Sequence, residues 1–106
     1  MPTGRTRVRS SPLHGRGVFA AQRFRRGDFI ATALGRQTEI DGPYVLWVLQ
    51  GDGSYRGVKV ASQLRFLNHS RRPNAEFEGA ALYAIKAITP DEEITFDYGD
   101  GSEGFD

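Results

Sequence analysis

The stretch that decides the fold lies in the second half of the chain and reads Leu64-Arg65-Phe66-Leu67-Asn68-His69-Ser70-Arg71-Arg72-Pro73-Asn74. An amide, an imidazole and a hydroxyl stand side by side at Asn68, His69 and Ser70, after an apolar run. Taken alone, this pattern indicates a polar loop whose side chains are held by local hydrogen bonds. It does not indicate a hydrolase dyad, because adjacent residues seldom point at each other as a nucleophile and its base must.

A glycine-rich segment precedes this stretch and reads Ser11-Pro12-Leu13-His14-Gly15-Arg16-Gly17-Val18-Phe19-Ala20. Two glycines one residue apart allow the backbone to approach a ligand closely, because no side chain stands in the way. The segment is not a dinucleotide-binding fingerprint, since no third glycine and no helix follow. Alone, it indicates a turn.

A third segment lies near the C-terminus and reads Ile88-Thr89-Pro90-Asp91-Glu92-Glu93-Ile94-Thr95-Phe96-Asp97-Tyr98-Gly99. Pro90-Asp91 predicts a turn, residues 93–96 predict a strand, and Tyr98 stands where that strand ends. A tyrosine at a strand end is usually a packing residue with a satisfied hydroxyl. This segment alone therefore gives no function.

Taken in order, the three segments resemble the SET-domain family over about residues 6–100. Residues 14–20 are similar to the opening G-x-G segment of that family. Residues 65–70 with Pro73-Asn74 are similar to its R-F-x-N-H-S-x-x-P-N motif, and residues 92–99 to its E-E-[LI]-T-F-D-Y-G motif. The chain resembles a minimal SET domain without zinc-binding flanking segments, as in small bacterial and viral members.

The resemblance implies a mostly β fold of the SET-domain (β-clip) type. Such a fold consists of several small twisted sheets with a C-terminal pseudoknot, in which the N-H-S segment passes through a loop closed by the last motif. We therefore expect residues 65–70 and 93–99 to lie together in space.

The resemblance also implies an enzyme that transfers methyl groups from S-adenosyl-L-methionine to the ε-amine of a protein lysine. Tyr98 matches the active-site tyrosine of the family, and Phe96, Tyr98 and Phe105 are the expected lysine-channel residues. Phe96 matches a position where phenylalanine leaves room for di- or trimethylation. No metal is expected. The residues that would bind the cofactor are His14, Gly15, Arg16, Gly17, Arg65, Asn68 and His69.

Two other functions remain open. Many SET enzymes carry a tyrosine in an E-Y-x-G-E stretch, where this chain has Thr32-Ala33-Leu34-Gly35-Arg36. Ala33 thus favours the alternative of a catalytically weak or inactive module that binds the cofactor or a basic peptide. The other alternative is a domain that binds nucleic acid through the arginines near the N-terminus, which are Arg5, Arg7, Arg9, Arg23, Arg25 and Arg26.

Composition bounds the rest of the fold. The 106 residues are 39% apolar, which fits one domain over 1–106, with 101–106 as a short tail. The sequence contains no cysteine, so we expect a hydrophobic core, without disulfides, to stabilise this domain. Short apolar runs between turn residues predict strands, and Ser62 is the expected cap of one helical turn at 61–66. The continuous apolar run 44–49 predicts a strand buried on both faces. The predicted strands are 6–9, 17–20, 29–34, 44–49, 57–60, 75–77, 82–87 and 93–96.

Charge is distributed unevenly along the chain. Residues 1–36 hold eight arginines and one acid, whereas residues 74–106 hold nine acids and one lysine. We expect these segments to attract each other, or the acidic one to attract a basic protein substrate. The N-terminus lacks the apolar run of a secretory signal and no stretch is long enough to span a membrane, so we expect a cytoplasmic protein. A second copy of the chain is a further candidate partner, on grounds of size alone.

Overall fold

The computed structural model describes residues 5–97, and those residues form strands, turns and one short 3-10 helix, without an α-helix. The mostly β prediction is therefore confirmed. Within this range no helix has the length and apolar character to cross a bilayer. The elements are β1 (Thr6–Ser10), β2 (Arg16–Ala20), β3 (Phe29–Thr32), β4 (Gly35–Thr38), β5 (Val45–Leu49), β6 (Tyr55–Val60), η1 (Gln63–Phe66), β7 (Asn68–His69), β8 (Ala75–Glu78), β9 (Ala81–Ala84) and β10 (Glu93–Phe96).

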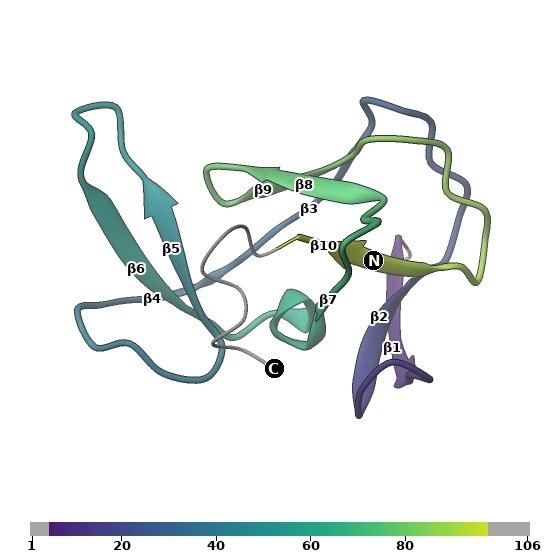
Figure 1. Ribbon diagram of the computed structural model, residues 1–106, viewed down its shortest axis with the longest axis horizontal. Coiled ribbons are helices and arrows are strands. Elements are labelled where there is room, and N and C mark those ends of the chain that lie inside the picture. Colours follow the sequence, from purple (N-terminus) through teal and green to yellow (C-terminus); the bar gives the residue numbers. More distant parts are fainter. Residues whose placement is uncertain (1–4, 98–106) are drawn as a thin grey trace.

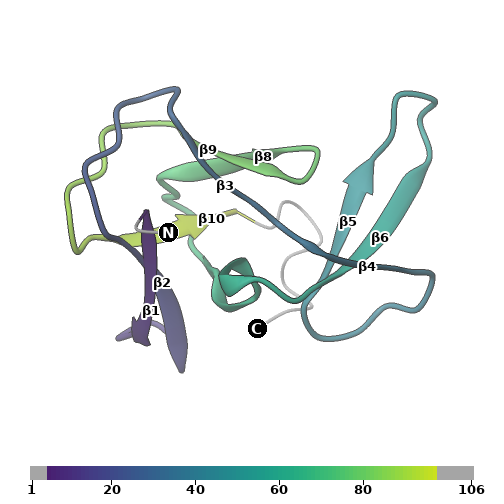
Figure 2. The same cartoon turned by 180° about the vertical axis from the view of Figure 1, so that it is seen from behind.

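The strands of residues 5–97 form three small sheets, with orders β1-β2-β10-β7, β3-β9-β8 and β4-β6-β5. The hairpin β1–β2 lies at one end of the molecule and the sheet β4-β6-β5 at the other (Figure 1). The view from behind shows β3, β8, β9 and β10 between these two ends (Figure 2). Several small sheets, rather than one large one, are what the sequence resemblance implied.

The core is built from the inward-facing residues of the sheets. Val18 of β2 and Ile94 of β10 are opposite each other in the sheet and fully buried. Ile30 of β3 and Leu82 of β9 are also fully buried. Burying side chains of this size stabilises the fold by about 1.5–3 kcal/mol each. Phe24 and Ile88, also fully buried, join their connecting segments by an isolated bridge.

The strand β10 joins the N-terminal hairpin to the N-H-S segment. β10 pairs antiparallel with β2 on one side and parallel with β7 on the other, with Thr95 opposite Asn68 and Phe96 opposite His69. Parallel neighbours require a long crossover connection; here it contains β8 and β9. The pairing confirms the prediction that residues 65–70 and 93–99 meet, as far as the described residues extend.

Two strands were not predicted, and a third was predicted correctly as a strand but wrongly as buried on both faces. β4 and β7 escaped prediction, because β4 is polar and exposed and β7 has only two residues. The run 44–49 is buried on one face only, since Trp47 remains 38% exposed and Leu49 59%. Ser62 does stand at the N-cap of η1, but its hydroxyl accepts the Leu34 N–H at 3.3 Å instead of a helical N–H.

Trp47, on the exposed face of β5, explains why β6 has a glycine at position 57. The Trp47 ring lies across Gly57, its partner in the sheet, and its indole N–H donates to the Asp41 carboxylate at 3.1 Å. A methyl group on Gly57 would lie 2.8 Å from the Trp47 ring and 2.5 Å from the Thr38 carbonyl oxygen. The indole therefore requires glycine at this position.

Gly57→Ala is expected to destabilise the protein by about 1–3 kcal/mol, because the added methyl overpacks this face of the sheet. The free energy of unfolding in urea measures the effect. Gly42→Ala is the matched control, since nothing lies within 4 Å of the methyl that it adds. Equal stability of the two variants would show that Trp47 moves aside without cost.

Candidate active site

Asn68 of β7 joins all three sequence motifs. Its side-chain Nδ2 donates to the carbonyl oxygens of His14, at 3.1 Å, and Arg16, at 3.0 Å, and to the Glu93 carboxylate, at 2.8 Å. The residue is only 9% exposed. The amide has two hydrogens for these three acceptors, so at least one is shared. The structure thus shows Asn68 holding the glycine segment against β10; direct contact with a cofactor stays a prediction.

Glu93 is the central acceptor of this cluster and was not assigned a role from the sequence. The Ser11 hydroxyl lies 2.7 and 2.9 Å from the two carboxylate oxygens of Glu93. The same hydroxyl accepts a hydrogen bond from the Leu13 N–H at 2.9 Å. A side chain at Gly17 would collide with the Glu93 carboxylate. Gly17 therefore allows the carboxylate to reach Asn68. No sequence pattern could have revealed this contact, because 82 residues separate Ser11 from Glu93.

The glycine segment presents bare backbone at Gly15. This residue has a positive φ of 45°, and nothing lies within 4 Å of the place where a side chain would begin. Its carbonyl oxygen accepts the Ser11 N–H at 2.8 Å, which closes the turn. A ligand can therefore approach the backbone at Gly15 without meeting a side chain.

Two arginine guanidinium groups lie close to the Phe66 ring. The Arg65 guanidinium lies 4.3 Å from the ring centroid and that of Arg16 lies 5.6 Å away. Arg65 also donates to the carbonyl oxygens of Ala61, at 2.6 Å, and Ser62, at 3.2 Å. Of the two roles expected for Arg65, the structure shows the supporting one: it holds η1 in place beside the N-H-S segment.

Tyr44 packs edge-on against Phe66, with the ring centroids 6.1 Å apart, and was not predicted to belong to the site. Its φ of 67° is unusual for a bulky residue. Half of the residue is exposed, so it forms part of the surface next to Phe66. A positive φ at a tyrosine leaves no sequence signal; here Tyr44 lies in a turn in which the Val45 N–H donates to the Gly42 carbonyl oxygen at 3.3 Å.

The described part of the expected lysine channel is Phe96. Its ring packs perpendicular to Phe77, with the centroids 5.1 Å apart, which gives an apolar aromatic surface at the end of β10. Ala33, at the place of the family tyrosine, is 4% exposed and belongs to the core. Tyr98 and Phe105 lie outside the described residues, so their roles stay predictions.

His69 is half-buried, and its Nδ1 lies 3.8 Å from the Asp97 carboxylate. The Ser70 N–H donates to the Phe96 carbonyl oxygen at 3.0 Å, which continues the pairing beyond β7. Asn74 completes the connection: its amide donates to the Glu93 carbonyl at 2.8 Å and accepts the Thr95 N–H at 2.9 Å. The N-H-S-x-x-P-N stretch is thus fixed to β10 at both of its ends.

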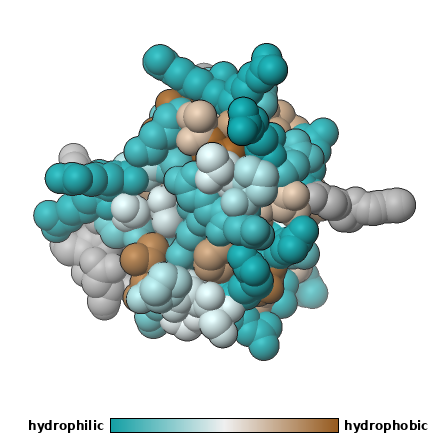
Figure 3. Space-filling view, turned by 90° about the vertical axis from the view of Figure 1, so that its right-hand side faces the viewer, coloured by the Kyte–Doolittle hydropathy of each residue, from teal (hydrophilic) through white to brown (hydrophobic). Residues whose placement is uncertain are grey.

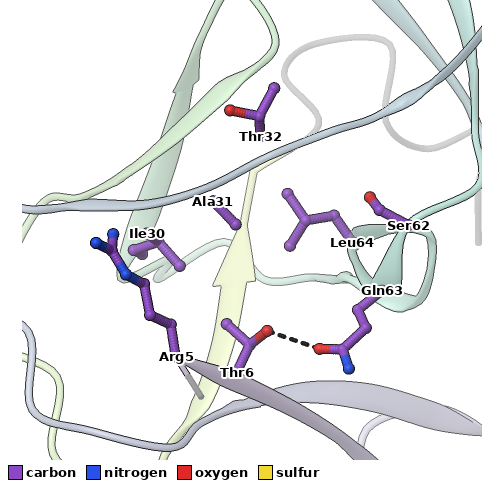
Figure 4. Close-up of a pocket in the computed structure, with 8 residues that line it drawn as sticks. All are labelled: Arg5, Thr6, Ile30, Ala31, Thr32, Ser62, Gln63 and Leu64. Atoms are coloured by element: carbon purple, nitrogen blue, oxygen red, sulfur yellow. Dashed lines mark hydrogen bonds between the residues drawn. The ribbon is translucent and has the colours of Figure 1, made fainter. Parts of the chain in front are cut away.

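A cavity of about 340 Å³ lies elsewhere, between the start of β1, β3 and η1 (Figure 4). Thr6 donates across it to Gln63 at 2.7 Å. None of the expected cofactor-binding residues lines it, so it is separate from the cluster around Asn68. Within residues 5–97 no group of three or more His, Asp or Glu side chains is placed to hold a metal ion. The cavity is lined by Arg5, Thr6, Ile30, Ala31, Thr32, Ser62, Gln63 and Leu64.

Comparison with known proteins agrees with this arrangement. The family model of the SET domain matches residues 15–99. The methyltransferase domain of the human histone-lysine N-methyltransferase SETMAR superposes with a TM-score of 0.73 at 24% identity, over 88% of this chain and 44% of that one. The methyltransferase domain of human PR domain-containing protein 2 superposes with a TM-score of 0.68 at 18% identity, over 90% and 77%.

A third similar structure is ctPRC2, from Chaetomium thermophilum, in an autoinhibited conformation bound to S-adenosylmethionine. Its TM-score is 0.76 at 24% identity, over 93% of this chain and 16% of that one. The chain thus spans less than half the length of the SETMAR and ctPRC2 chains that it matches. At these identities the superpositions show a shared fold. With the family match over most of its length, they establish that this chain belongs to the SET domain family.

Proposed function

We propose that this protein transfers methyl groups from S-adenosyl-L-methionine to the ε-amine of lysine in a basic protein. The observation that carries the proposal is the cluster in which the Asn68 amide joins the glycine segment, the N-H-S segment and the carboxylate of the closing motif. These are the motifs by which the chain resembles SET enzymes. Their contact supports a single site formed by all three.

The residues of this cluster fit the expected cofactor. The bare backbone at Gly15 leaves room for a ligand, and His14, Arg16 and Gly17 adjoin it in the chain. His69 follows Asn68, whose amide is bonded to this segment. S-adenosyl-L-methionine carries a positive sulfonium and a positive ammonium group, and the half-buried Glu93 carboxylate beneath the glycine segment is a complementary charge. When bound, the cofactor would supply an electrophilic methyl group.

The chain must supply position and a neutral amine. A free lysine has a pKa of about 10.4, so neutralising it at pH 7 costs about 4–5 kcal/mol. An apolar aromatic surface such as that of Phe96 and Phe77 favours the neutral amine, because burial disfavours the charged form. Tyr98 stands two residues after the end of β10 in the sequence and is the proposed catalytic residue, which would orient the amine through its hydroxyl. The acidic C-terminal third would attract a basic substrate.

Incubation with methyl-labelled S-adenosyl-L-methionine and a panel of basic proteins tests the proposal. Label on lysine residues, identified by mass spectrometry, is the expected result. Cofactor binding without transfer to any lysine would instead support the alternative of a catalytically inactive binding module. That alternative rests on Ala33, which is buried in the core and contributes no aromatic ring to a channel.

Glu93→Gln is expected to weaken the binding of S-adenosyl-L-methionine about tenfold. The substitution keeps the shape of the side chain and removes the charge that accepts hydrogen bonds from Ser11 and Asn68, and a hydrogen bond to a charged group contributes about 1.5–3 kcal/mol. Isothermal titration calorimetry measures the dissociation constant. Glu78→Gln, an exposed carboxylate of β8, is the matched control and should leave it unchanged. Equal affinity in the two variants would contradict the role given to Glu93.

A further inference from the structure

The end of the molecule formed by β1, β2 and the connection 21–28 carries an excess of positive charge. Residues 5–28 contain seven arginines and one acid, and the neighbouring connection 85–93 contains one lysine and three acids, which leaves four positive charges. Figure 1 shows these segments together, away from the sheet β4-β6-β5. Seen from that side, hydrophilic side chains dominate the surface (Figure 3).

The acidic segment does not neutralise this end within the described residues. The sequence predicts attraction between the two, but in residues 5–97 one ion pair joins them, between Arg9 and Asp91 at 3.3 Å, and both partners are largely exposed. Arg5 donates to the Phe29 carbonyl and lies over the Phe29 ring. The other exposed arginines of this end make no side-chain hydrogen bond or ion pair within the same range: Arg7, Arg23, Arg25 and Arg26.

The local backbone directs these side chains outward. Alternation along β1 places Arg7 and Arg9 on one face of an edge strand, about 6.4–6.8 Å apart, and Arg5 immediately precedes that strand. Phe24 is fully buried in its bridge to Ile88, so the flanking Arg23 and Arg25 are exposed. The Phe19 and Phe24 rings of this end are buried, and the 41% exposed Phe29 ring is covered by the Arg5 guanidinium and packs edge-on against Tyr83.

We propose that this surface, the arginine end, binds the phosphate backbone of a double-stranded nucleic acid. It is defined by Arg5, Arg7, Arg9, Arg23, Arg25 and Arg26. Arginine suits phosphate oxygens because its planar group can donate two parallel hydrogen bonds. Exposed guanidinium groups whose one partly exposed ring, Phe29, already contacts Arg5 fit a duplex, whose bases are stacked inside, rather than a single strand, which is bound largely by stacking. The surface is distinct from the cluster around Asn68 and goes beyond methyl transfer.

Fluorescence anisotropy with a labelled 20-base-pair DNA duplex of random sequence tests the proposal, in 50 to 200 mM salt. Each phosphate contact contributes about −0.9 to the slope of log K against log salt, so four to six arginines predict a slope of about −4 to −5. The triple variant Arg7→Ala, Arg23→Ala, Arg25→Ala is expected to reduce the size of the slope by about 2–3 and to weaken binding more than tenfold. Within residues 5–97 these three side chains are exposed and make no hydrogen bond or ion pair, so circular dichroism should show an unchanged melting temperature.

The matched control removes the same charge from the opposite end of the molecule, through Arg36→Ala, Arg56→Ala and Lys59→Ala in β4 and β6. It should keep the slope and affinity of the natural sequence. Equal weakening in both triple variants would assign the binding to net charge and overturn the proposal. Binding of a 20-nucleotide single strand as tight as that of the duplex would also overturn the proposal. Displacement of the duplex by polyglutamate as effective as that by unlabelled DNA would overturn it too, and would indicate that the surface binds an acidic protein.

Discussion

Replacing Tyr98 with Phe is expected to lower the rate of methyl transfer to lysine by about 10²–10³-fold. The proposed hydroxyl orients the lysine amine at the reacting methyl group, and removal of one well-placed hydrogen-bonding group at a reaction centre typically costs that much. The affinity for S-adenosyl-L-methionine should change less than about twofold, because binding is assigned to the glycine and N-H-S segments. Single-turnover methyl transfer and calorimetric binding measure the two quantities separately.

Tyr55→Phe is the matched control for this variant. Tyr55 is 64% exposed in β6, at the other end of the molecule, and loss of its hydroxyl should leave both quantities unchanged. Equal losses of rate and affinity in Tyr98→Phe would mean that Tyr98 supports the cofactor site rather than the reaction. An unchanged rate would remove Tyr98 from the mechanism.

Asn74→Ala is expected to lower the free energy of unfolding by about 3 kcal/mol. Asn74 is 4% exposed, and its amide pairs with the Glu93 carbonyl and the Thr95 N–H of β10. Alanine leaves both backbone groups without their partner in the interior, and each such group costs about 1–3 kcal/mol. A domain of this size is stable by only about 5–15 kcal/mol, so the loss is a large fraction. Urea denaturation measures it as a lower midpoint at constant slope.

Gln37→Ala provides the comparison for Asn74→Ala, because Gln37 is an exposed amide of β4. Its loss should change the free energy of unfolding by less than about 0.5 kcal/mol. If Asn74→Ala were as stable as Gln37→Ala, the attachment of the N-H-S-x-x-P-N stretch to β10 would not depend on this side chain, and water would have replaced it.

The parts of the fold that the sequence predicted well are those encoded by local pattern. β2 and β10 are short apolar runs between turn residues, and their valine and isoleucine side chains face the core as expected. The turn at 51–54 also formed, with Gly53 at a positive φ of 88°. There, hydrogen bonds from the Ser54 hydroxyl and N–H hold the pKa of Asp52 below its ordinary value.

The predictions that failed concern elements formed by contacts between residues that are far apart in the sequence. β7 is a strand only because β10 passes beside it, and the polar β4 owes its pairing to β6. The run at 44–49 is apolar on both sides, yet Tyr44, Trp47 and Leu49 remain 50%, 38% and 59% exposed. Hydropathy alone cannot tell a buried face from one that is exposed.

The candidate site shows the same division. Asn68 and the glycine segment could be found because they belong to recognisable motifs, and the structure does bring them together. Ser11, Glu93 and Tyr44 could not, since their parts in the site come from contacts between residues far apart in the chain. The structure adds that the Asn68 amide shapes the loop, and its direct role in binding stays a prediction.

The most direct test of the central claim is a crystal structure of the protein with S-adenosyl-L-methionine. The cofactor should lie against the backbone of residues 14–17 and beside Asn68 and His69, with its methyl group facing the Tyr98 hydroxyl. Unchanged hydrogen bonds from Asn68 to the glycine segment and to Glu93 should accompany binding. A cofactor bound in the cavity between β1, β3 and η1, or one with Tyr98 remote from its methyl group, would contradict the account.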